Sequence, residues 1–218
     1  MNTKKFAVVL AGCGVYDGAE IQEAVLTLLA IDKSGAIYEC FSPDINQYHV
    51  INHFTGKEMN ESRNVLVESA RIARGKIRKL AEFEPENFDA IVFPGGFGVA
   101  KNLCTFAIDG PDCLVNPVVE RVILKCTEAK LPIGALCISP ALIAKVLKKV
   151  TLTIGTDPDT ANAIQTIGAT HQIAEGSDIV IDLHNKVVTS PCYMLDASIS
   201  TVAQGAENVI HALLELME

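Results

Sequence analysis

One cysteine stands where it could act as a nucleophile. Cys137 directly follows the apolar run Pro132-Ile-Gly-Ala-Leu136, and one residue later Ser139-Pro-Ala-Leu-Ile-Ala144 begins, whose early proline is typical of a helix start. Its sulfur would lie at a helix N-terminus, where the positive end of the dipole favours the thiolate. Most cysteines are small buried hydrophobes, but the position of Cys137 between a strand and a helix favours a nucleophile elbow.

A glycine-rich turn could supply the donors that such a nucleophile needs. Pro94-Gly-Gly-Phe-Gly98 follows a second predicted strand, residues 89–93. Glycines let backbone N–H groups point into open space. We expect an oxyanion to be bound by the N–H of Gly96 or Phe97 together with that of Ile138. A plain tight turn is the alternative.

Two carboxylates are candidates for the acid or base. Glu20 and Glu23 stand near the start of a predicted helix over residues 20–33, three positions apart and hence on adjoining faces. Either could face a pocket. Both could equally serve only to complement the helix dipole.

Histidine, metal and dinucleotide sites have weaker support. His49 and His53 are four residues apart but lie in an irregular stretch with no third ligand at a fixed spacing, so we expect no metal. Gly12-Cys-Gly14 after the first strand suggests dinucleotide binding, with Glu39 as the ribose acceptor. Asp17 and Glu20 would then face an anionic pyrophosphate, which disfavours that reading.

The elements that must position these residues alternate between strands and helices. Apolar runs predict strands at residues 6–11, 36–42, 89–93, 132–136, 179–182 and 187–190, and a short strand near Leu152. Helices are predicted at residues 20–33, 61–74, 116–129 and 198–216, and a further helix begins at residue 139. Residues 43–57 are predicted to form a long loop. This order predicts a three-layer α/β/α sandwich, flavodoxin-like, with a mostly parallel sheet and ligands at the carboxyl ends of its strands. We expect one domain over residues 1–218. His184-Asn185 would form a two-residue hairpin turn.

Composition narrows the class of partner. A formal charge of −8 provides no basic stripe for nucleic acid. The apolar stretch at residues 6–11 is only as long as a strand, too short for a signal sequence or a membrane span, so we expect no membrane partner. Seven widely spaced cysteines form no C-x-x-C pair, which favours reduced thiols and a cytoplasmic location.

Several longer runs resemble the ElbB (enhancing lycopene biosynthesis) glyoxalase-like family, in the PfpI-like branch of the class I glutamine amidotransferase-like superfamily. They are residues 12–26, 50–56, 63–64, 94–98, 100–102, 137–141 and 152–157. In the superfamily the elbow cysteine pairs with a glutamate of the first helix. The resemblance assigns that role to Glu23, with Glu20 as the fallback. It also implies a homodimer and a metal-free, glutathione-independent glyoxalase activity.

The chain departs from the wider superfamily because Ile138 follows Cys137, where no histidine supplies a Cys-His partner. Protease and glutaminase chemistry are therefore disfavoured.

The first hypothesis is a glyoxalase III-like lyase without a cofactor. Cys137 would attack the aldehyde of glyoxal or methylglyoxal, and Glu23, with a pKa raised by burial, would move the proton between carbons. The alternative is a degenerate amidotransferase-like protein that binds a metabolite or senses redox state through an exposed, low-pKa Cys137, with the link to isoprenoid metabolism that the family name suggests. Tyr16, Asp17, Asn64, Asp157 and Tyr193 are lower-ranked candidates for the pocket wall.

Overall fold

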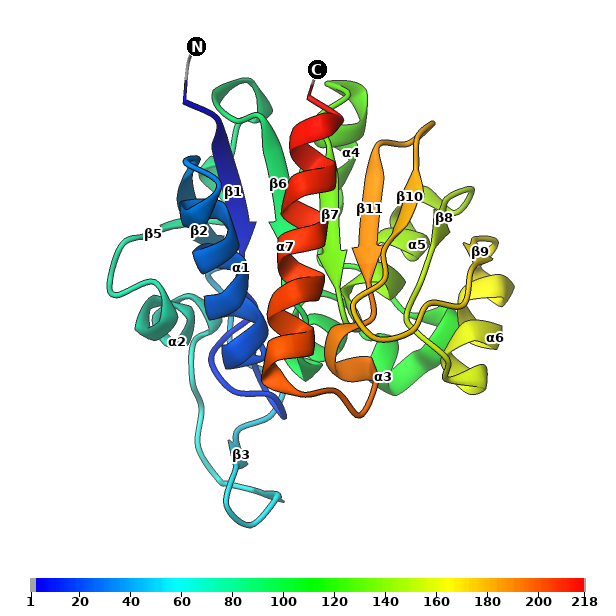
Figure 1. Cartoon of the computed structure of the whole chain (residues 1–218). Coiled ribbons are helices and arrows are strands. Elements are labelled where there is room, and N and C mark those ends of the chain that lie inside the picture. Colours follow the sequence, from blue (N-terminus) through cyan, green and yellow to red (C-terminus); the bar gives the residue numbers. More distant parts are fainter. Residues whose placement is uncertain (1–2, 218) are drawn as a thin grey trace.

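A seven-stranded sheet forms the centre of the computed structural model, which describes residues 3–217 (Figure 1). The strand order is β10-β11-β7-β6-β1-β2-β5, and every neighbouring pair is parallel except β10 with β11. The strands of this sheet are β1 (Lys5–Val9), β2 (Ile37–Ser42), β5 (Ile77–Lys79), β6 (Ala90–Phe93), β7 (Ile133–Leu136), β10 (Val180–Asp182) and β11 (Val187–Ser190). Two smaller sheets pair β3 (Ile51–Asn52) with β4 (Lys57–Glu58), and β8 (Thr151–Leu152) with β9 (Thr170–His171).

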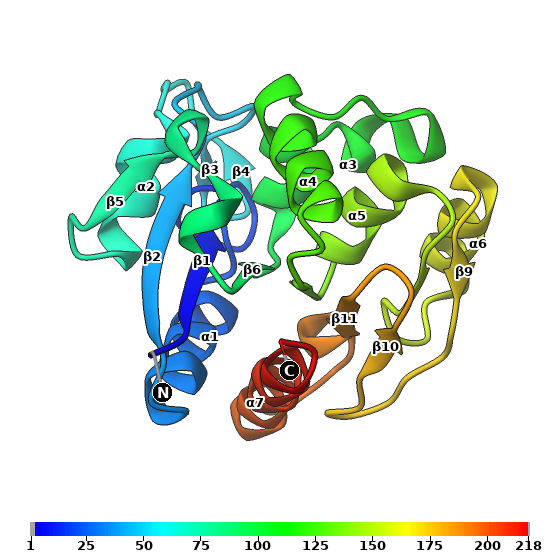
Figure 2. The same cartoon turned by 90° about the horizontal axis from the view of Figure 1, so that it is seen from above.

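Helices cover both faces of the sheet, which confirms the three-layer α/β/α sandwich. α1 (Ile21–Lys33) and α7 (Ile199–Glu215) lie together on one face, and α4 (Pro117–Glu128) and α5 (Ser139–Leu147) lie on the other (Figure 2). The remaining helical elements are α2 (Val65–Ile72), α3 (Phe106–Asp109), α6 (Pro158–Ile167), a π-helical turn (Val99–Leu103) and 3₁₀ turns at Leu80–Glu82, Pro85–Asn87, Gly110–Asp112 and Cys192–Met194.

The central strands are apolar on both sides because both sides are covered. Along β1, Phe6 and Val8 face the core under α1 and α7, whereas Ala7 and Val9 face the core under α4 and α5. All four side chains are at most 1% exposed. A run without polar alternation is typical of a parallel strand buried on both faces.

The antiparallel hairpin at the sheet edge has a longer turn than predicted. Asp182 pairs with Val187, so residues 183–186 form a four-residue loop and not the predicted two-residue turn. Asp182 stabilises this loop because its carboxylate accepts from both the backbone N–H and the side-chain amide of Asn185. His184 is exposed, as expected.

Other boundaries also differ from prediction. The helix predicted at 61–74 is only α2, because Asn64 caps it by accepting from the N–H of Val67. The predicted loop 43–57 contains β3 and enters β4. α3, α6, β5 and the π-helical turn were not predicted from the sequence. No helix among residues 3–217 is long and apolar enough to cross a membrane.

The carboxyl ends of β6, β7 and β11 carry the segments of chemical interest. β6 leads into Pro94, β7 into Cys137, and β11 into Pro191 and the 3₁₀ turn Cys192–Met194. Since these strands are neighbours in the sheet, the three turns meet at one edge.

Candidate active site

Cys137 lies on a tight turn between β7 and α5. Its backbone has φ of +59°, a left-handed conformation that non-glycine residues seldom adopt. The N–H of Cys137 donates to the carbonyl of Ser190 at 3.0 Å, and the hydroxyl of Ser139 donates to the carbonyl of Pro94 at 2.8 Å. These bonds fix the turn to its neighbours and hold a strained residue in place, as in a nucleophile elbow.

Glu23 faces inward from the first turn of α1. Its side chain is 0% exposed, and each carboxyl oxygen accepts one backbone N–H: Oε2 from Gly95 and Oε1 from Tyr193, both at 3.0 Å. The Cys137 thiol lies beside the same carboxyl group, close enough for each group to shift the pKa of the other. Glu23 therefore contacts the turns that follow β6, β7 and β11, and Cys137 lies on the second of these turns.

Position 95 has no room for a side chain, because Glu23 and Cys137 occupy the space beside the backbone of Gly95. A Cβ on Gly95 would lie 2.4 Å from Cβ of Cys137 and 2.6 Å from Oε2 of Glu23. Both distances are far shorter than carbon and oxygen contacts allow. Any side chain here would force the carboxyl group and the elbow apart.

Burial sets the protonation of the pair. It raises the pKa of Glu23 to about 7, against the opposing effect of the two backbone donors. Burial also raises the pKa of the Cys137 thiol well above its ordinary value, and the charge of Glu23 adds to that effect. The prediction of an exposed, low-pKa thiol is therefore wrong: the sulfur is buried beside a carboxyl group, and these two effects outweigh the helix N-terminus.

The pair is consequently suited to proton transfer. A carboxyl group with a pKa near neutrality is close to equally populated in its acid and base forms at pH 7. Directly beside it is a thiol that must lose a proton to become a nucleophile.

The fold narrows the two predicted sets of oxyanion donors to one. The backbone N–H of Gly96 lies near the sulfur and lowers the pKa of the Cys137 thiol, although burial raises it by more. The N–H of Phe97 instead donates to the carbonyl of Val15 at 2.8 Å, so Phe97 is not available as an oxyanion donor. The N–H of Ile138 donates to no backbone carbonyl within residues 3–217, which leaves Gly96 and Ile138 as the available donors.

Glu20 has a different place from Glu23. Its Oε2 accepts from the backbone N–H of Glu23 and so caps α1. The side chain is partly exposed and lines the cavity, whereas Glu23 lies beneath it. Of the two glutamates, Glu23 is the one in contact with Cys137.

A cavity of about 450 Å³ opens above Cys137. Its apolar wall is formed by two alanines together with Val15, Phe97, Phe106, Ile138 and Met194. Its polar groups come from Glu20, Gly96, Cys137, Asp157, Thr160 and Tyr193. Of the lower-ranked candidates, Asp157 and Tyr193 do line this cavity, while Tyr16, Asp17 and Asn64 do not.

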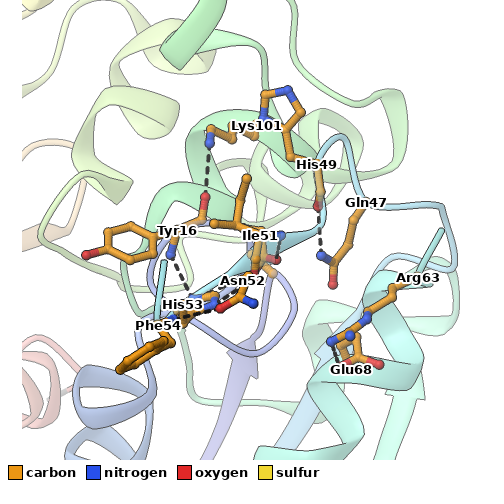
Figure 3. A network of polar contacts seen from close by, with 12 residues as sticks. Tyr16, Gln47, His49, Ile51, Asn52, His53, Phe54, Arg63, Glu68 and Lys101 are labelled. Atoms are coloured by element: carbon orange, nitrogen blue, oxygen red, sulfur yellow. Dashed lines mark hydrogen bonds and ion pairs between the residues drawn. The ribbon is translucent and has the colours of Figure 1, made fainter. Parts of the chain in front are cut away.

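The loop after β1 is occupied by contacts within the protein. Asp17 is buried and accepts from the N–H of Ile51 at 2.6 Å, and His53 bonds to the N–H of Tyr16 at 3.2 Å (Figure 3). A Cβ on Gly14 would lie 2.5 Å from Nε2 of His53. The segment predicted as a loop at 43–57 therefore braces this loop and does not line the cavity.

The same contacts leave the dinucleotide hypothesis without a site. Asp17 and His53 fill the space beside Gly14, and Glu39 is ion-paired with Lys5 and Arg78 at 2.7 and 3.0 Å. No histidine of the described chain lines the Cys137 cavity. Residues 3–217 contain no group of three or more His, Cys, Asp or Glu side chains arranged to hold a metal ion.

Two features of the site escaped sequence reasoning. Tyr193 contributes a backbone N–H to Glu23, and a backbone donor leaves no signal in residue type. Thr160 and Phe106 come from α6 and α3, which were not predicted. Asp157-Pro158 is a cap followed by an N1 proline, and this signal could have revealed α6.

Comparison with known proteins gives relatives along the whole chain. No family model matches. The human glutamine amidotransferase-like class 1 domain-containing protein 3, mitochondrial, is 47% identical over 222 residues, covering 97% of this chain and 83% of the human protein. A crystal structure of an isoprenoid biosynthesis protein with amidotransferase-like domain from Ehrlichia chaffeensis is 37% identical, with a TM-score of 0.93, and covers 99% of this chain and 100% of that one. Drosophila melanogaster DJ-1beta, 16% identical with a TM-score of 0.58 over 99% of this chain and 96% of its own, shares the fold.

Proposed function

The chain belongs to the family of glutamine amidotransferase-like class 1 domain proteins, and we propose that it is a glutathione-independent glyoxalase that needs no cofactor. The observation that carries the proposal is the buried Cys137–Glu23 pair at the floor of a cavity that no histidine of the described chain lines. Glutaminase and protease chemistry rely on a Cys-His pair, whereas aldehyde isomerisation needs only a thiol and a carboxyl group. Within the family we assign the chain to the ElbB-like, PfpI-related group.

The first half of the reaction forms a hemithioacetal. As the Cys137 sulfur bonds to the aldehyde carbon, the thiol proton passes to the Glu23 carboxylate and the C=O electron pair moves to oxygen. The N–H groups of Gly96 and Ile138 are the donors available to that oxyanion. Glu23 then returns the proton to the oxygen, which leaves a neutral adduct and a free carboxylate.

The second half moves two protons and releases the acid. The Glu23 carboxylate removes the proton from the former aldehyde carbon and delivers it to the neighbouring carbon, while the hydroxyl proton of the adduct passes to the ketone oxygen, which yields a thioester of the 2-hydroxy acid. Water adds to the thioester, the C–S bond breaks and Cys137 leaves with a proton. The sum is one 2-oxoaldehyde plus one water giving one 2-hydroxy acid, without an oxidant or reductant.

A metabolite-binding role linked to isoprenoid metabolism is the second candidate. The Ehrlichia relative is described as an isoprenoid biosynthesis protein, and it matches this chain with a TM-score of 0.93. The redox-sensing form of this alternative has less support, because Cys137 is only 7% exposed and its pKa is raised by burial. The expected homodimer and cytoplasmic location stay predictions; the name of the human relative places that protein in mitochondria.

Aldehyde consumption tests the proposal. Wild type and Cys137→Ala are compared on glyoxal and methylglyoxal without glutathione or metal, with Cys13→Ser as the control for loss of a thiol outside the cavity. We expect turnover in wild type and Cys13→Ser and none above background in Cys137→Ala. Equal consumption by wild type and Cys137→Ala would reject the glyoxalase and leave the binding role.

A further inference from the structure

We infer that the aldehyde accepted at Cys137 carries an apolar group and no negative charge. The inference rests on the proposed function and concerns its substrate class. Three observations support it: the size of the cavity, the chemistry of its walls and the sign of its charged groups.

The cavity is too large for the smallest 2-oxoaldehydes. A volume of about 450 Å³ has room for about 15 water molecules at ~30 Å³ each. Glyoxal and methylglyoxal have only a handful of heavy atoms and would leave most of that space filled with water. A substrate with a ring or a branched alkyl group in place of the methyl would displace that water from apolar walls.

Those walls come from separate parts of the chain and meet over the sulfur. Phe97 lies in the glycine turn after β6, Phe106 begins α3, and Met194 ends the 3₁₀ turn after β11. Each contributes an aromatic ring or a thioether, groups that bind apolar ligands by burial and by ring contacts. Phe97 is 48% exposed, which leaves part of its ring free for a ligand.

The charged groups of the cavity are all acidic. Asp157 caps α6 by accepting from the N–H of Thr160 at 2.8 Å, and hydrogen bonding from Thr160 lowers the pKa of this carboxyl group. Asp157 is therefore ionised at neutral pH. Glu20 adds a second carboxyl group, and Glu23 lies beneath the floor.

No described lysine, arginine or histidine lines the cavity to offset these charges. Lys101 is close by, but its ammonium donates to the carbonyl of Tyr16 at 3.0 Å and lies 5.1 Å from the centre of the Phe97 ring. A substrate carboxylate or phosphate would meet like charge here without a partner. The same charges favour departure of the product, which is a 2-hydroxy acid anion.

A matched set of substrates tests the inference. Phenylglyoxal supplies an apolar ring, 4-carboxyphenylglyoxal adds one negative charge to the same ring, and methylglyoxal lacks the ring. With the Cys137→Ala background subtracted, we expect kcat/KM for phenylglyoxal to exceed that for methylglyoxal by about tenfold or more, as burial of a ring predicts. We expect the carboxylated analogue to be roughly three- to tenfold poorer than phenylglyoxal, because like charges repel.

Two variants assign the selectivity to residues. Phe97→Ala is expected to reduce the preference for phenylglyoxal over methylglyoxal by about tenfold, whereas Phe54→Ala, which removes a phenylalanine that is 98% exposed and outside the cavity, keeps it. Asp157→Asn retains the helix cap and removes the charge, so it should raise the relative use of 4-carboxyphenylglyoxal. Asp159→Asn removes an exposed charge from the same helix outside the cavity, so it should leave the relative use of 4-carboxyphenylglyoxal unchanged.

The outcomes separate the two proposals. If no aldehyde of the set shows turnover that depends on Cys137, the proposed function fails and the substrate class fails with it. A different outcome is turnover that depends on Cys137 but has a kcat/KM for methylglyoxal, or for the carboxylated analogue, equal to that for phenylglyoxal. That result overturns the inference alone.

Discussion

The carboxyl group of Glu23 and the sulfur of Cys137 converge beside Gly95, where a Cβ would lie 2.6 Å from Oε2 of Glu23 and 2.9 Å from Sγ of Cys137. The two side chains come from residues more than a hundred positions apart, one in the first turn of α1 and the other on the turn after β7. Because one oxygen of Glu23 is also bound by Tyr193, the carboxyl group cannot move without breaking backbone contacts.

The first prediction separates the two glutamates. Glu23→Gln should lower kcat/KM for a 2-oxoaldehyde by roughly 10²–10⁴-fold, because it removes the group that transfers protons beside Cys137. Glu20→Gln should cause a much smaller loss, since Glu20 caps α1 and its carboxyl group does not contact the sulfur. Steady-state kinetics on folded variants, checked by circular dichroism, give the comparison. A larger loss in Glu20→Gln than in Glu23→Gln would reverse the assignment.

The second prediction concerns pH and stability. The folded protein binds a proton on Glu23 with a pKa of about 7, whereas an unfolded glutamate titrates near 4.3. Between these values the folded state holds more protons, so this carboxyl group makes unfolding easier as pH rises. The stabilisation by the proton is fully present below about pH 4 and is lost as pH rises through about 7. Glu23 thereby contributes a decline of about 3–4 kcal/mol in the free energy of unfolding.

Urea denaturation of wild type and Glu23→Gln between pH 4.5 and 7.5 measures that decline. The difference in slope, and not the absolute stability, is the readout, because a glutamine at position 23 also loses one acceptor for the two backbone N–H groups. Glu20→Gln serves as the control. Parallel pH profiles for wild type and Glu23→Gln would contradict a raised pKa at this position.

The third prediction tests the space at Gly95. Gly95→Ala places a methyl group against Glu23 and Cys137, so the elbow or the carboxyl group must move. We expect a loss of about 1–3 kcal/mol in stability, as for overpacked cores, together with a large loss of activity. Gly75→Ala is the control, since a Cβ there meets nothing within 4 Å and only the positive φ of +78° opposes it. If Gly95→Ala retains wild-type activity, the tight packing around the pair is not needed for its chemistry.

The elements that could be predicted from the sequence are those whose burial leaves a pattern of apolar residues. β6, β7 and the part of β1 after Lys5 are apolar because both of their faces are covered, and this property can be read from residue types. β5 was missed because it is an edge strand whose Arg78 and Lys79 are exposed. α6 was missed because its only buried residue is Ile164, so it lacks an apolar stripe.

The site shows the same division. The position of Cys137 after a strand and of Glu23 in a first helical turn could be predicted from local order. The protonation of Cys137 could not, because it depends on how deeply three turns bury the sulfur. The exclusion of Phe97 as a donor depends on the carbonyl of Val15, which approaches it only through the tertiary fold.

The fourth prediction concerns Asn102, which joins the loop after β1 to the segment that braces it. Its amide is 7% exposed, donates to the carbonyls of Ala11 and Asp17 at 3.0 and 2.9 Å, and accepts from the N–H of Tyr48 at 2.9 Å. Asn102→Ala leaves two buried carbonyls and one partly buried N–H without this partner, at a cost of about 2–4 kcal/mol.

The loss of these hydrogen bonds should also speed local opening of the two segments that Asn102 connects. Residues 12–18 and 45–53 are both held by Asn102 or by the Asp17 contact, so we expect their amide hydrogens to exchange faster in Asn102→Ala than those of β6 and β7. Gln47→Ala is the control, because that amide donates to a single carbonyl, that of His49, and is partly exposed (Figure 3). Because Val15 of the same loop lines the cavity and accepts from Phe97, turnover should fall in Asn102→Ala but not in Gln47→Ala. Unchanged exchange in residues 12–18 would show that the glycine turn holds this loop without Asn102.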